Sequence, residues 1–248
     1  MISFRNVRKS FGTREVLKGI TFDVPEGQIL FILGTSGTGK SVLLKNIVGL
    51  LQPTSGTILV DGENVAKMTE EQLFPIRRKC GMVFQHPALF DSLIVFENVA
   101  FGLRKHYPDY GPDQIAKRVH ECLALVHLKG VEDRMPQEIS YGMQKRVSLA
   151  RTVAVNPRIL LFDEPTTGLD PVTTRAINHL IFELSRKLKT TSLVVSHDMQ
   201  CALEIADHVI VLDKGEIVEQ GSPADLKRSP HPLVRDFLKE ALNAEASS

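Results

Sequence analysis

Residues 28–41 read Gln28-Ile29-Leu30-Phe31-Ile32-Leu33-Gly34-Thr35-Ser36-Gly37-Thr38-Gly39-Lys40-Ser41, and this stretch decides the fold. Its first part is an uninterrupted apolar run, which is typical of a strand that is buried on both faces of a sheet. Its second part fits the phosphate-loop pattern GxxxxGK[ST] in full, and the apolar residues after it recur at helical spacing. A strand, a glycine-rich loop and a helix in this order predict an α/β fold that binds a nucleoside triphosphate.

The residue types of the loop suit a bound triphosphate. Glycines allow backbone dihedrals that turn successive N–H groups toward a phosphate, and a side chain would disfavour those dihedrals. The helix that begins near Ser41 adds its positive end, Lys40 can reach the β and γ phosphates, and the Ser41 hydroxyl can bind Mg²⁺. A glycine-rich turn with a chance lysine is the alternative, and the flanking strand and helix disfavour it. The predicted nucleotide contacts are Gly34, Thr35, Ser36, Gly37, Thr38, Gly39, Lys40, Ser41 and Val42.

A second apolar strand, residues 158–162, is followed by two carboxylates, Asp163 and Glu164. Asp163 at the end of the strand can hold the water shell of Mg²⁺, and Glu164 can polarise the water that attacks the γ phosphate. A solvated acidic turn is the simpler alternative, but the phosphate loop upstream argues against it. We therefore predict that Glu164 is a general base.

Strand and helix patterns alternate through most of the chain and give way to helices in the middle. Between Gln85 and Ser140 the patterns are helical, most clearly from Pro112 onward. Strands separated by helices predict a parallel sheet with right-handed crossovers. The strands expected after the helical segment lie at residues 158–162, 192–196 and 209–212. The predicted parts are a core of residues 1–85 and 156–222, an inserted helical subdomain of residues 86–155, and a C-terminal tail of residues 223–248 that is helical near 233–242.

Composition narrows the class of protein further. The 248 residues carry 30 Lys and Arg against 29 Asp and Glu, so the net charge of +1 provides no general attraction to nucleic acid or to an anionic membrane. No apolar run approaches the roughly 18 residues of a membrane helix, and the first residues do not resemble a signal peptide. Cys80, Cys122 and Cys201 fit no metal-binding spacing, so we interpret them as packing residues in a reducing cytosol.

Two further motifs carry a family resemblance. Residues 163–170 read Asp163-Glu164-Pro165-Thr166-Thr167-Gly168-Leu169-Asp170, and residues 139–146 before them read Ile139-Ser140-Tyr141-Gly142-Met143-Gln144-Lys145-Arg146. Together with the phosphate loop they resemble an ABC-type ATPase, from about Ile2 to Gly221. The resemblance implies an α/β fold of the P-loop type, with a mainly parallel core sheet, an antiparallel β edge near the N-terminus and the inserted helical subdomain. It also implies hydrolysis of ATP with Mg²⁺.

In the family that this chain resembles, two ATP molecules lie between two subunits, each held by one phosphate loop and the partner's signature segment. The resemblance gives Ser140 and Gly142 the signature role, at the start of a helix where free N–H groups can meet a partner's γ phosphate. An ordinary helix cap at Ser140 is compatible with that role. The resemblance also places Asp170 in a loop that crosses the dimer interface.

The same resemblance assigns three more roles. Gln85 would join Asp163 and Ser41 around Mg²⁺ and sense the membrane partner, and His197 at the end of a strand would contact the γ phosphate. A structural histidine is the alternative for His197. Phe11, or less readily Val16, would stack on adenine, although aromatic residues near a terminus are often core residues.

The sequence departs from the family pattern at two positions. Tyr141 stands where the family has the first of two adjacent glycines, which leaves only Gly142. Val42 stands where a threonine commonly offers a hydroxyl to the α phosphate. One neutral hydrogen bond contributes about 0.5–1.5 kcal/mol, so we still expect an active ATPase.

The segment of residues 85–101 most resembles the ATPase of Mce-associated, Mla-type phospholipid transporters of bacterial envelopes, and Met143 after Gly142 favours the same group. That resemblance implies a second copy or a similar ATPase subunit, a membrane-spanning permease and a lipid-binding Mce-type subunit as partners, no nucleic acid, and a peripheral place on the cytoplasmic face of the inner membrane. An importer of amino acids or other small polar solutes is the alternative. Non-transport ABC ATPases are disfavoured, because they usually carry long coiled coils or two ATPase units in one chain.

Three apolar residues follow Gln85 within this segment, namely Phe90, Leu93 and Phe96. We expect some of them to form a groove for a short cytoplasmic helix of the permease. Internal packing of the helical subdomain is the equally weighted alternative, because most large apolar side chains are buried.

Overall fold

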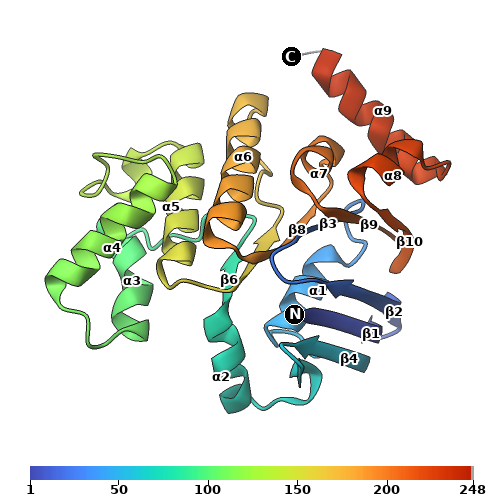
Figure 1. Cartoon of the computed structure of the whole chain (residues 1–248), viewed down its shortest axis with the longest axis horizontal. Helices are drawn as coiled ribbons and strands as arrows, with labels where there is room; N and C mark the ends of the chain where they lie inside the picture. The colour runs from blue at the N-terminus through green and yellow to red at the C-terminus, as the bar shows by residue number, and fades with distance from the viewer. Residues whose placement is uncertain (247–248) are drawn as a thin grey trace.

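Two apolar runs, one before the phosphate loop and one before Asp163 and Glu164, form interior strands of one six-stranded sheet. In the computed structural model, which describes residues 1–246, the strand order of this sheet is β10-β9-β3-β8-β7-β6 (Figure 1). Its strands are β3 (Ile29–Leu33), β6 (Cys80–Val83), β7 (Ile159–Asp163), β8 (Thr191–Ser196), β9 (His208–Asp213) and β10 (Glu216–Gly221). Neighbouring strands are parallel except β9 and β10. The prediction of a mainly parallel core sheet is confirmed.

Burial on both faces explains why β3 and β7 show no alternation of polar and apolar residues. In β3, Phe31 packs with the helices on one face of the sheet, whereas Leu30 and Ile32 pack in a second hydrophobic cluster on the other face. All five residues of β3 and of β7 are buried. A strand of this kind cannot lie at an edge, so the loops that follow β3 and β7 are anchored at the centre of the molecule.

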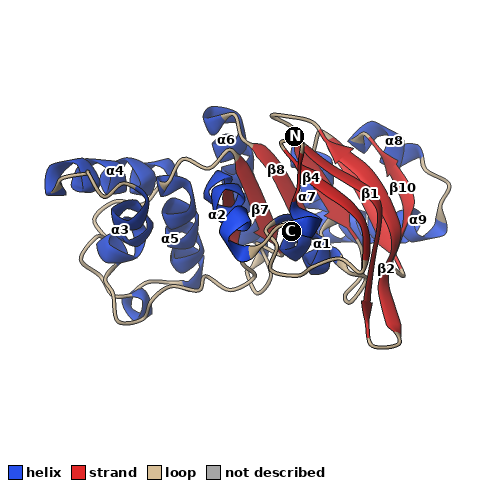
Figure 2. Cartoon of the chain, turned by 90° about the horizontal axis from the view of Figure 1, so that it is seen from below, coloured by secondary structure: helices blue, strands red, loops and turns tan. Residues whose placement is uncertain are grey.

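The antiparallel strands form a sheet of their own rather than an extension of the parallel sheet. Its order is β2-β1-β4-β5, with β1 (Ile2–Phe11), β2 (Arg14–Val24), β4 (Ser55–Val60) and β5 (Glu63–Asn64). Figure 2 shows β1, β2 and β4 as one layer in front of the parallel strands. The inner side chains of this layer, such as Phe4 and Ile58, share a hydrophobic cluster with α1 (Lys40–Ile47) and with Leu30 and Ile32. The second sheet therefore fixes the helix that follows the phosphate loop.

The helical segment lies at one side of the molecule, on the left in Figure 1. It contains α3 (Val95–His106), α4 (Pro112–Leu125) and α5 (Tyr141–Ala154), with a short 3₁₀ turn at Pro136–Glu138. These helices all fall within the predicted range 86–155. Their buried residues belong to the same hydrophobic cluster as Phe31 and Phe162 of the sheet, so the segment shares a core with the parallel sheet. The division into core and subdomain stays a prediction.

Helices α6 (Pro171–Leu188) and α7 (Met199–Ile205) connect the last parallel strands, and α8 (Pro223–Arg228) and α9 (Pro232–Ala246) follow β10. The tail prediction of a helix near 233–242 is confirmed by α9, and the last two residues of the predicted tail, 247–248, lie outside the described residues. Helix α2 (Glu70–Lys79) is an addition to the predicted elements, although its capping box at Thr69 and Gln72 is visible in the sequence.

The structure also bears on the predictions made for the three cysteines and for membrane-spanning helices. Cys122 and Cys201 are buried and Cys80 is partly buried, and the three are free thiols, in agreement with a packing role. Between residues 1 and 246, no helix combines the length and the apolar composition that crossing a membrane requires.

Candidate nucleotide site

The phosphate loop leaves β3 at Leu33 and enters α1 at Lys40. Gly39 is the N-cap of α1 with φ of 103°, and Gly37 has φ of 79°, two conformations that side chains disfavour. A Cβ atom at Gly39 would also lie 2.8 Å from Cδ2 of Leu17. No side chain caps α1, so the first N–H groups of the helix are available for an anion.

Lys40 stands at the centre of the site and is only 5% exposed. Its Nζ donates to the carbonyl oxygens of Gly34 at 2.7 Å and Thr35 at 3.1 Å. It also lies 3.2 Å from Oε1 of Glu164, which forms an ion pair across the mouth of the loop. A buried ammonium group that faces a loop of backbone N–H groups and glycines is a strong electrostatic attractor for phosphate.

The Glu164 carboxylate is held by three donors. Besides Lys40, Nδ1 of His197 lies 2.9 Å from Oε2, and the Thr167 hydroxyl donates to the same oxygen at 3.3 Å. Glu164 follows β7 with φ of 48°, a conformation that is uncommon for a residue with a side chain and that clusters at functional sites. This backbone turn directs the carboxylate toward the loop after β3 instead of continuing the strand.

Two opposing effects act on the protonation of Glu164. Burial raises the pKa of this carboxyl, but the hydrogen bond from His197 and the charge of Lys40 outweigh burial, and the pKa lies below its usual value. The hydrogen bond to Glu164 raises the pKa of His197, against the opposing effect of partial burial. Glu164 is therefore ionised at neutral pH, as a group that accepts a proton must be.

Asp163 and Ser41 are also brought together. The Ser41 hydroxyl donates to Oδ1 of Asp163 at 2.6 Å. Ser41 also lines a cavity over the loop together with Gln85, which lies two residues after β6. The Ser41 hydroxyl, the Asp163 carboxylate and the amide oxygen of Gln85 are ligands of the kind that Mg²⁺ prefers, and they leave most positions to phosphate and water. In the part of the chain that the structure describes, no group of three His, Cys, Asp or Glu residues could hold a metal. The set therefore fits an ion that arrives with a nucleotide.

A cavity of about 900 Å³ lies over the loop. Its lining contains most of the residues that were predicted to bind nucleotide or metal or to take part in catalysis. These are Phe11, Thr35, Ser36, Gly37, Gly39, Lys40, Ser41, Val42, Gln85, Glu164 and His197. Phe11 is 47% exposed, which excludes the alternative that it is a core residue, and Val16 lines the cavity beside it. Gly34 and Thr38 are not part of the lining. Thr38 is buried and donates to the Thr35 carbonyl, and a Cβ atom at Gly34 would lie 2.5 Å from the Leu212 carbonyl oxygen of β9.

Some lining residues were missed from the sequence. Arg14 of β2 lies beside Gly37, and one face of α9 contributes Leu233, Asp236, Phe237 and Glu240. The spacing of these α9 residues marks one helix face, but no local signal indicates which surface that face covers. Thr167 belongs to a quoted motif, yet its hydrogen bond to Glu164 depends on the turn after β7.

Ser140, Gly142 and Asp170 lie elsewhere. They line a separate cavity of about 330 Å³, which shares no lining residue with the cavity over the phosphate loop. Ser140 is the N-cap of α5 and accepts from Met143 N, and Asp170 is the N-cap of α6, where it accepts from the backbone and hydroxyl of Thr173. A Cβ atom at Gly142 would lie 2.8 Å from Cγ2 of Thr173, so close packing also requires this glycine.

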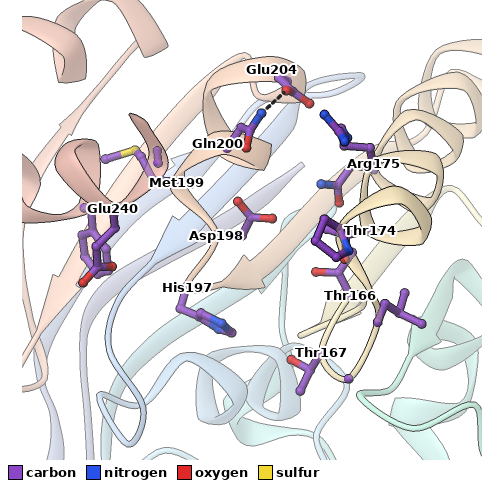
Figure 3. A pocket seen from close by; sticks show the side chains of 16 residues that line it. Thr166, Thr167, Thr174, Arg175, His197, Asp198, Met199, Gln200, Glu204 and Glu240 are labelled. Atoms are coloured by element: carbon purple, nitrogen blue, oxygen red, sulfur yellow. Dashed lines mark hydrogen bonds between the residues drawn. The ribbon is translucent and has the colours of Figure 1, made fainter. Parts of the chain in front are cut away.

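A third cavity, of about 540 Å³, adjoins the phosphate cavity and is drawn in Figure 3. Thr167, His197, Phe237 and Glu240 belong to both linings. In the figure, His197 and Thr167 face the space at its lower end, and Glu240 faces it from α9. His197 thus borders two cavities, and its side chain is accessible from both while it contacts Glu164.

Comparison with known proteins identifies the family. The sequence profile described as "ABC transporter" matches residues 17–167. The chain belongs to the ABC transporter family. It is similar over 99% of its length, at 41% identity, to the methionine import ATP-binding protein MetN of Carboxydothermus hydrogenoformans, of which it covers 73%. It is also 41% identical, over 96% of its length and 88% of the relative, to the intermembrane phospholipid transport system ATP-binding protein MlaF of Escherichia coli K12.

A solved structure agrees with this assignment to the ABC transporter family. A dimeric ATP-binding cassette in a post-hydrolysis state, bound to ADP and Pi, superimposes with a TM-score of 0.82 and 33% identity, covering 90% of this chain and 99% of the other. The chain is therefore an ATPase subunit of an ABC transporter, and the predicted fold and enzyme class are confirmed.

The first prediction from this geometry concerns Glu164. Glu164→Gln keeps the shape of the side chain but removes the base, so ATP should bind nearly as in the wild type while hydrolysis slows at least about a hundredfold. Steady-state hydrolysis and equilibrium nucleotide binding measure the two effects. Glu71→Gln, on the exposed part of α2, is the control. Wild-type turnover by Glu164→Gln would show that Glu164 is not the base.

The second prediction concerns Lys40. Lys40→Ala removes a buried charge that faces the phosphates before and during the reaction, so ATP affinity itself should fall about tenfold or more. Lys45→Ala, in the last turn of the same helix, should leave the dissociation constant unchanged. Equal affinity for ATP in both variants would contradict the assigned loop.

Proposed function

We propose that ATP binds in the cavity over the phosphate loop and is hydrolysed only when Ser140 and Gly142 of a second subunit complete the site. The observation that carries this proposal is the separation of the two cavities within one chain, which share no lining residue. The signature helix can therefore serve a nucleotide on another subunit more readily than its own. The second subunit is another copy of this chain or a similar ATPase, with Asp170 in the interface between them.

In the proposed reaction, Phe11 stacks on adenine, the loop N–H groups and Lys40 bind the phosphates, and Ser41, Asp163 and Gln85 hold the Mg²⁺ that accompanies ATP. Bound Mg²⁺ neutralises phosphate charge and orients the β and γ phosphates. Glu164 accepts a proton from the attacking water. His197 and Thr167 orient the carboxylate through their hydrogen bonds to it. His197 also lines the cavity over the phosphate loop, and in this proposal it contacts the γ phosphate.

We further propose that hydrolysis drives movement of phospholipid or another lipid across a bacterial envelope. The resemblance of residues 85–101 and Met143 to lipid transporters supports this, as does the 41% identity to an ATPase of intermembrane phospholipid transport. In this reading a membrane-spanning permease holds the chain at the cytoplasmic face of the inner membrane, and an Mce-type subunit binds lipid. Import of methionine or a similar solute is the second candidate, because the identity to a methionine import ATPase is also 41%.

A reconstituted complex distinguishes these two substrates. The chain, tagged and purified from its native membrane in detergent together with its permease, would be placed in liposomes and assayed for ATP hydrolysis. Stimulation of ATP hydrolysis by added phospholipid, without stimulation by added amino acids, supports lipid transport. The opposite pattern supports the importer.

The shared site predicts ATP-dependent dimers. Glu164→Gln should be largely monomeric without nucleotide and should dimerise with ATP, because the bound phosphates then link two subunits without being hydrolysed. Light scattering measures the mass. The control is the double variant Glu164→Gln with Ser140→Arg, which blocks the signature and should stay monomeric. A Glu164→Gln chain that remains monomeric at high protein and ATP concentrations would refute the shared site.

The exposure of the apolar residues after Gln85 supports a narrower choice of groove residues. Phe90 is 41% exposed and packs on Phe101, whose ring lies 4.7 Å away and which is 49% exposed. Asn98 is fully buried and bonds the backbone of Phe90 in both directions, which fixes the position of this loop. Phe96 packs against the main hydrophobic cluster, and Leu93 is half-buried. We therefore assign the permease contact to Phe90 and Phe101, of which the sequence indicated only the first.

Phe90→Asp and Phe101→Asp should leave the chain folded with normal ATP affinity, because both side chains are exposed, and should abolish stimulation of hydrolysis in the assembled transporter. Tyr110→Asp, at a similarly exposed aromatic residue beyond α3, is the control for a new charge. Thermal unfolding, copurification of the permease and stimulated hydrolysis are the measurements. Intact assembly and stimulation in both variants would move the permease contact to another surface.

A further inference from the structure

Tyr141 is the residue at which this chain departs from the signature of its family, and the structure gives its side chain specific neighbours. The ring is half-buried at the first turn of α5. A methyl group on Gly168 would lie 3.8 Å from Cε1 of the ring, and Nζ of Lys145 lies 5.6 Å from the ring centroid. The ring thus packs against the loop that leads to Asp170.

The hydroxyl of Tyr141 reaches a second loop. It lies 3.3 Å from Nδ1 of His86, the residue after Gln85. Burial raises the pKa of Tyr141, so the phenol keeps its proton and can donate to Nδ1 of His86 in the tautomer that carries its hydrogen on Nε2. Phenylalanine would fill the same space but would lack this bond.

Lys145 provides a parallel connection one turn further along α5. It is 2% exposed, and its ammonium group donates to the main-chain carbonyl of Gln85. Residues four apart lie on one face of a helix, so Tyr141 and Lys145 together hold the consecutive residues Gln85 and His86. The helix that begins at Ser140 is thereby joined to the loop that begins at Gln85.

We propose that Tyr141 is a positioning residue, which fixes Ser140 and Gly142 relative to Gln85 through the hydrogen bond between its hydroxyl and His86. The inference rests on the shared site proposed above. The phosphate loop makes the first contacts with ATP and is not touched by Tyr141, so loss of the bond affects closure of the two subunits and turnover. It leaves initial nucleotide binding unchanged.

A double-mutant cycle on the full chain tests this role. Tyr141→Phe keeps the ring and loses the bond, and His86→Ala removes the other partner from an exposed loop. Each should lower kcat about three- to tenfold, the range of one neutral hydrogen bond, with ATP affinity and the thermal unfolding midpoint unchanged. The double variant should be no slower than the slower single variant, because both remove the same interaction.

Two further variants separate positioning from packing. His86→Asn places an amide near the position of Nδ1 and should restore most of the rate. Tyr107→Phe removes another hydroxyl, which donates to the Val155 carbonyl at 3.2 Å, and should leave kcat unchanged. Wild-type kcat in Tyr141→Phe, or multiplied losses in the double variant, would overturn the proposal. Failure of the Glu164→Gln variant to dimerise with ATP would refute the shared site. The double-mutant cycle, measured as kcat, would still show whether Tyr141 and His86 act together.

Discussion

The parallel register of β3, β8 and β7 is the constraint on which the site depends. Leu33 pairs with Ser196, and Asp163 pairs with Val195, so all three strands end at the same edge of the sheet. The residues that follow are the phosphate loop, Glu164 and His197, which are far apart in the sequence. A shift of one residue in any of these pairings would turn side chains to the opposite face and separate Glu164 from Lys40. The apolar residues of β3 and β7 alternate between the two hydrophobic clusters, so such a shift would move each of them out of the cluster in which it is packed.

This constraint also explains which parts could be predicted. The central strands have a continuous apolar pattern, and the loops after them need glycine and carboxylate residues for local chemical reasons, so fold class and the principal site residues follow from short segments. Other features depend on contacts between distant segments. Strands β1, β2, β4 and β5 form a sheet of their own, Arg14 of β2 lies beside Gly37 of the phosphate loop, and one face of α9 lines the nucleotide cavity. Local propensity carries no signal for any of these. Helix α2 is a different case, since Thr69 and Gln72 form a capping box that the sequence displays.

The same folding logic divides the catalytic apparatus into two parts. The phosphate loop, Glu164 and His197 follow parallel strands and line one cavity, whereas Ser140, Gly142 and Asp170 line another, with Ser140 and Asp170 as the N-caps of α5 and α6. A helix cap holds the first N–H groups of its helix in a fixed direction, so in the proposed shared site each signature would already be shaped when a partner arrives. Association would then supply the missing contacts without refolding either part. ATP affinity would depend on the phosphate loop, and hydrolysis would depend in addition on the approach of the partner.

In the proposed transporter, control of that approach passes through the segment after β6, where we place the permease contact. Gln85 and His86 contact α5 through Lys145 and Tyr141, and Asn98 fixes the backbone at Phe90 a few residues further. A displacement of the exposed pair Phe90 and Phe101 would therefore reach the start of the signature helix through a short, hydrogen-bonded stretch. These contacts join segments of the ATPase itself, so the proposed coupling needs no contact between the ATPase and the transported molecule. This is consistent with equal identity to relatives named for methionine and for phospholipid, because an ATPase that reads only the position of its permease places no requirement on the substrate. In the proposed transporter, selectivity for the substrate would then belong to the permease, and selectivity for the permease would belong to the surface around Phe90.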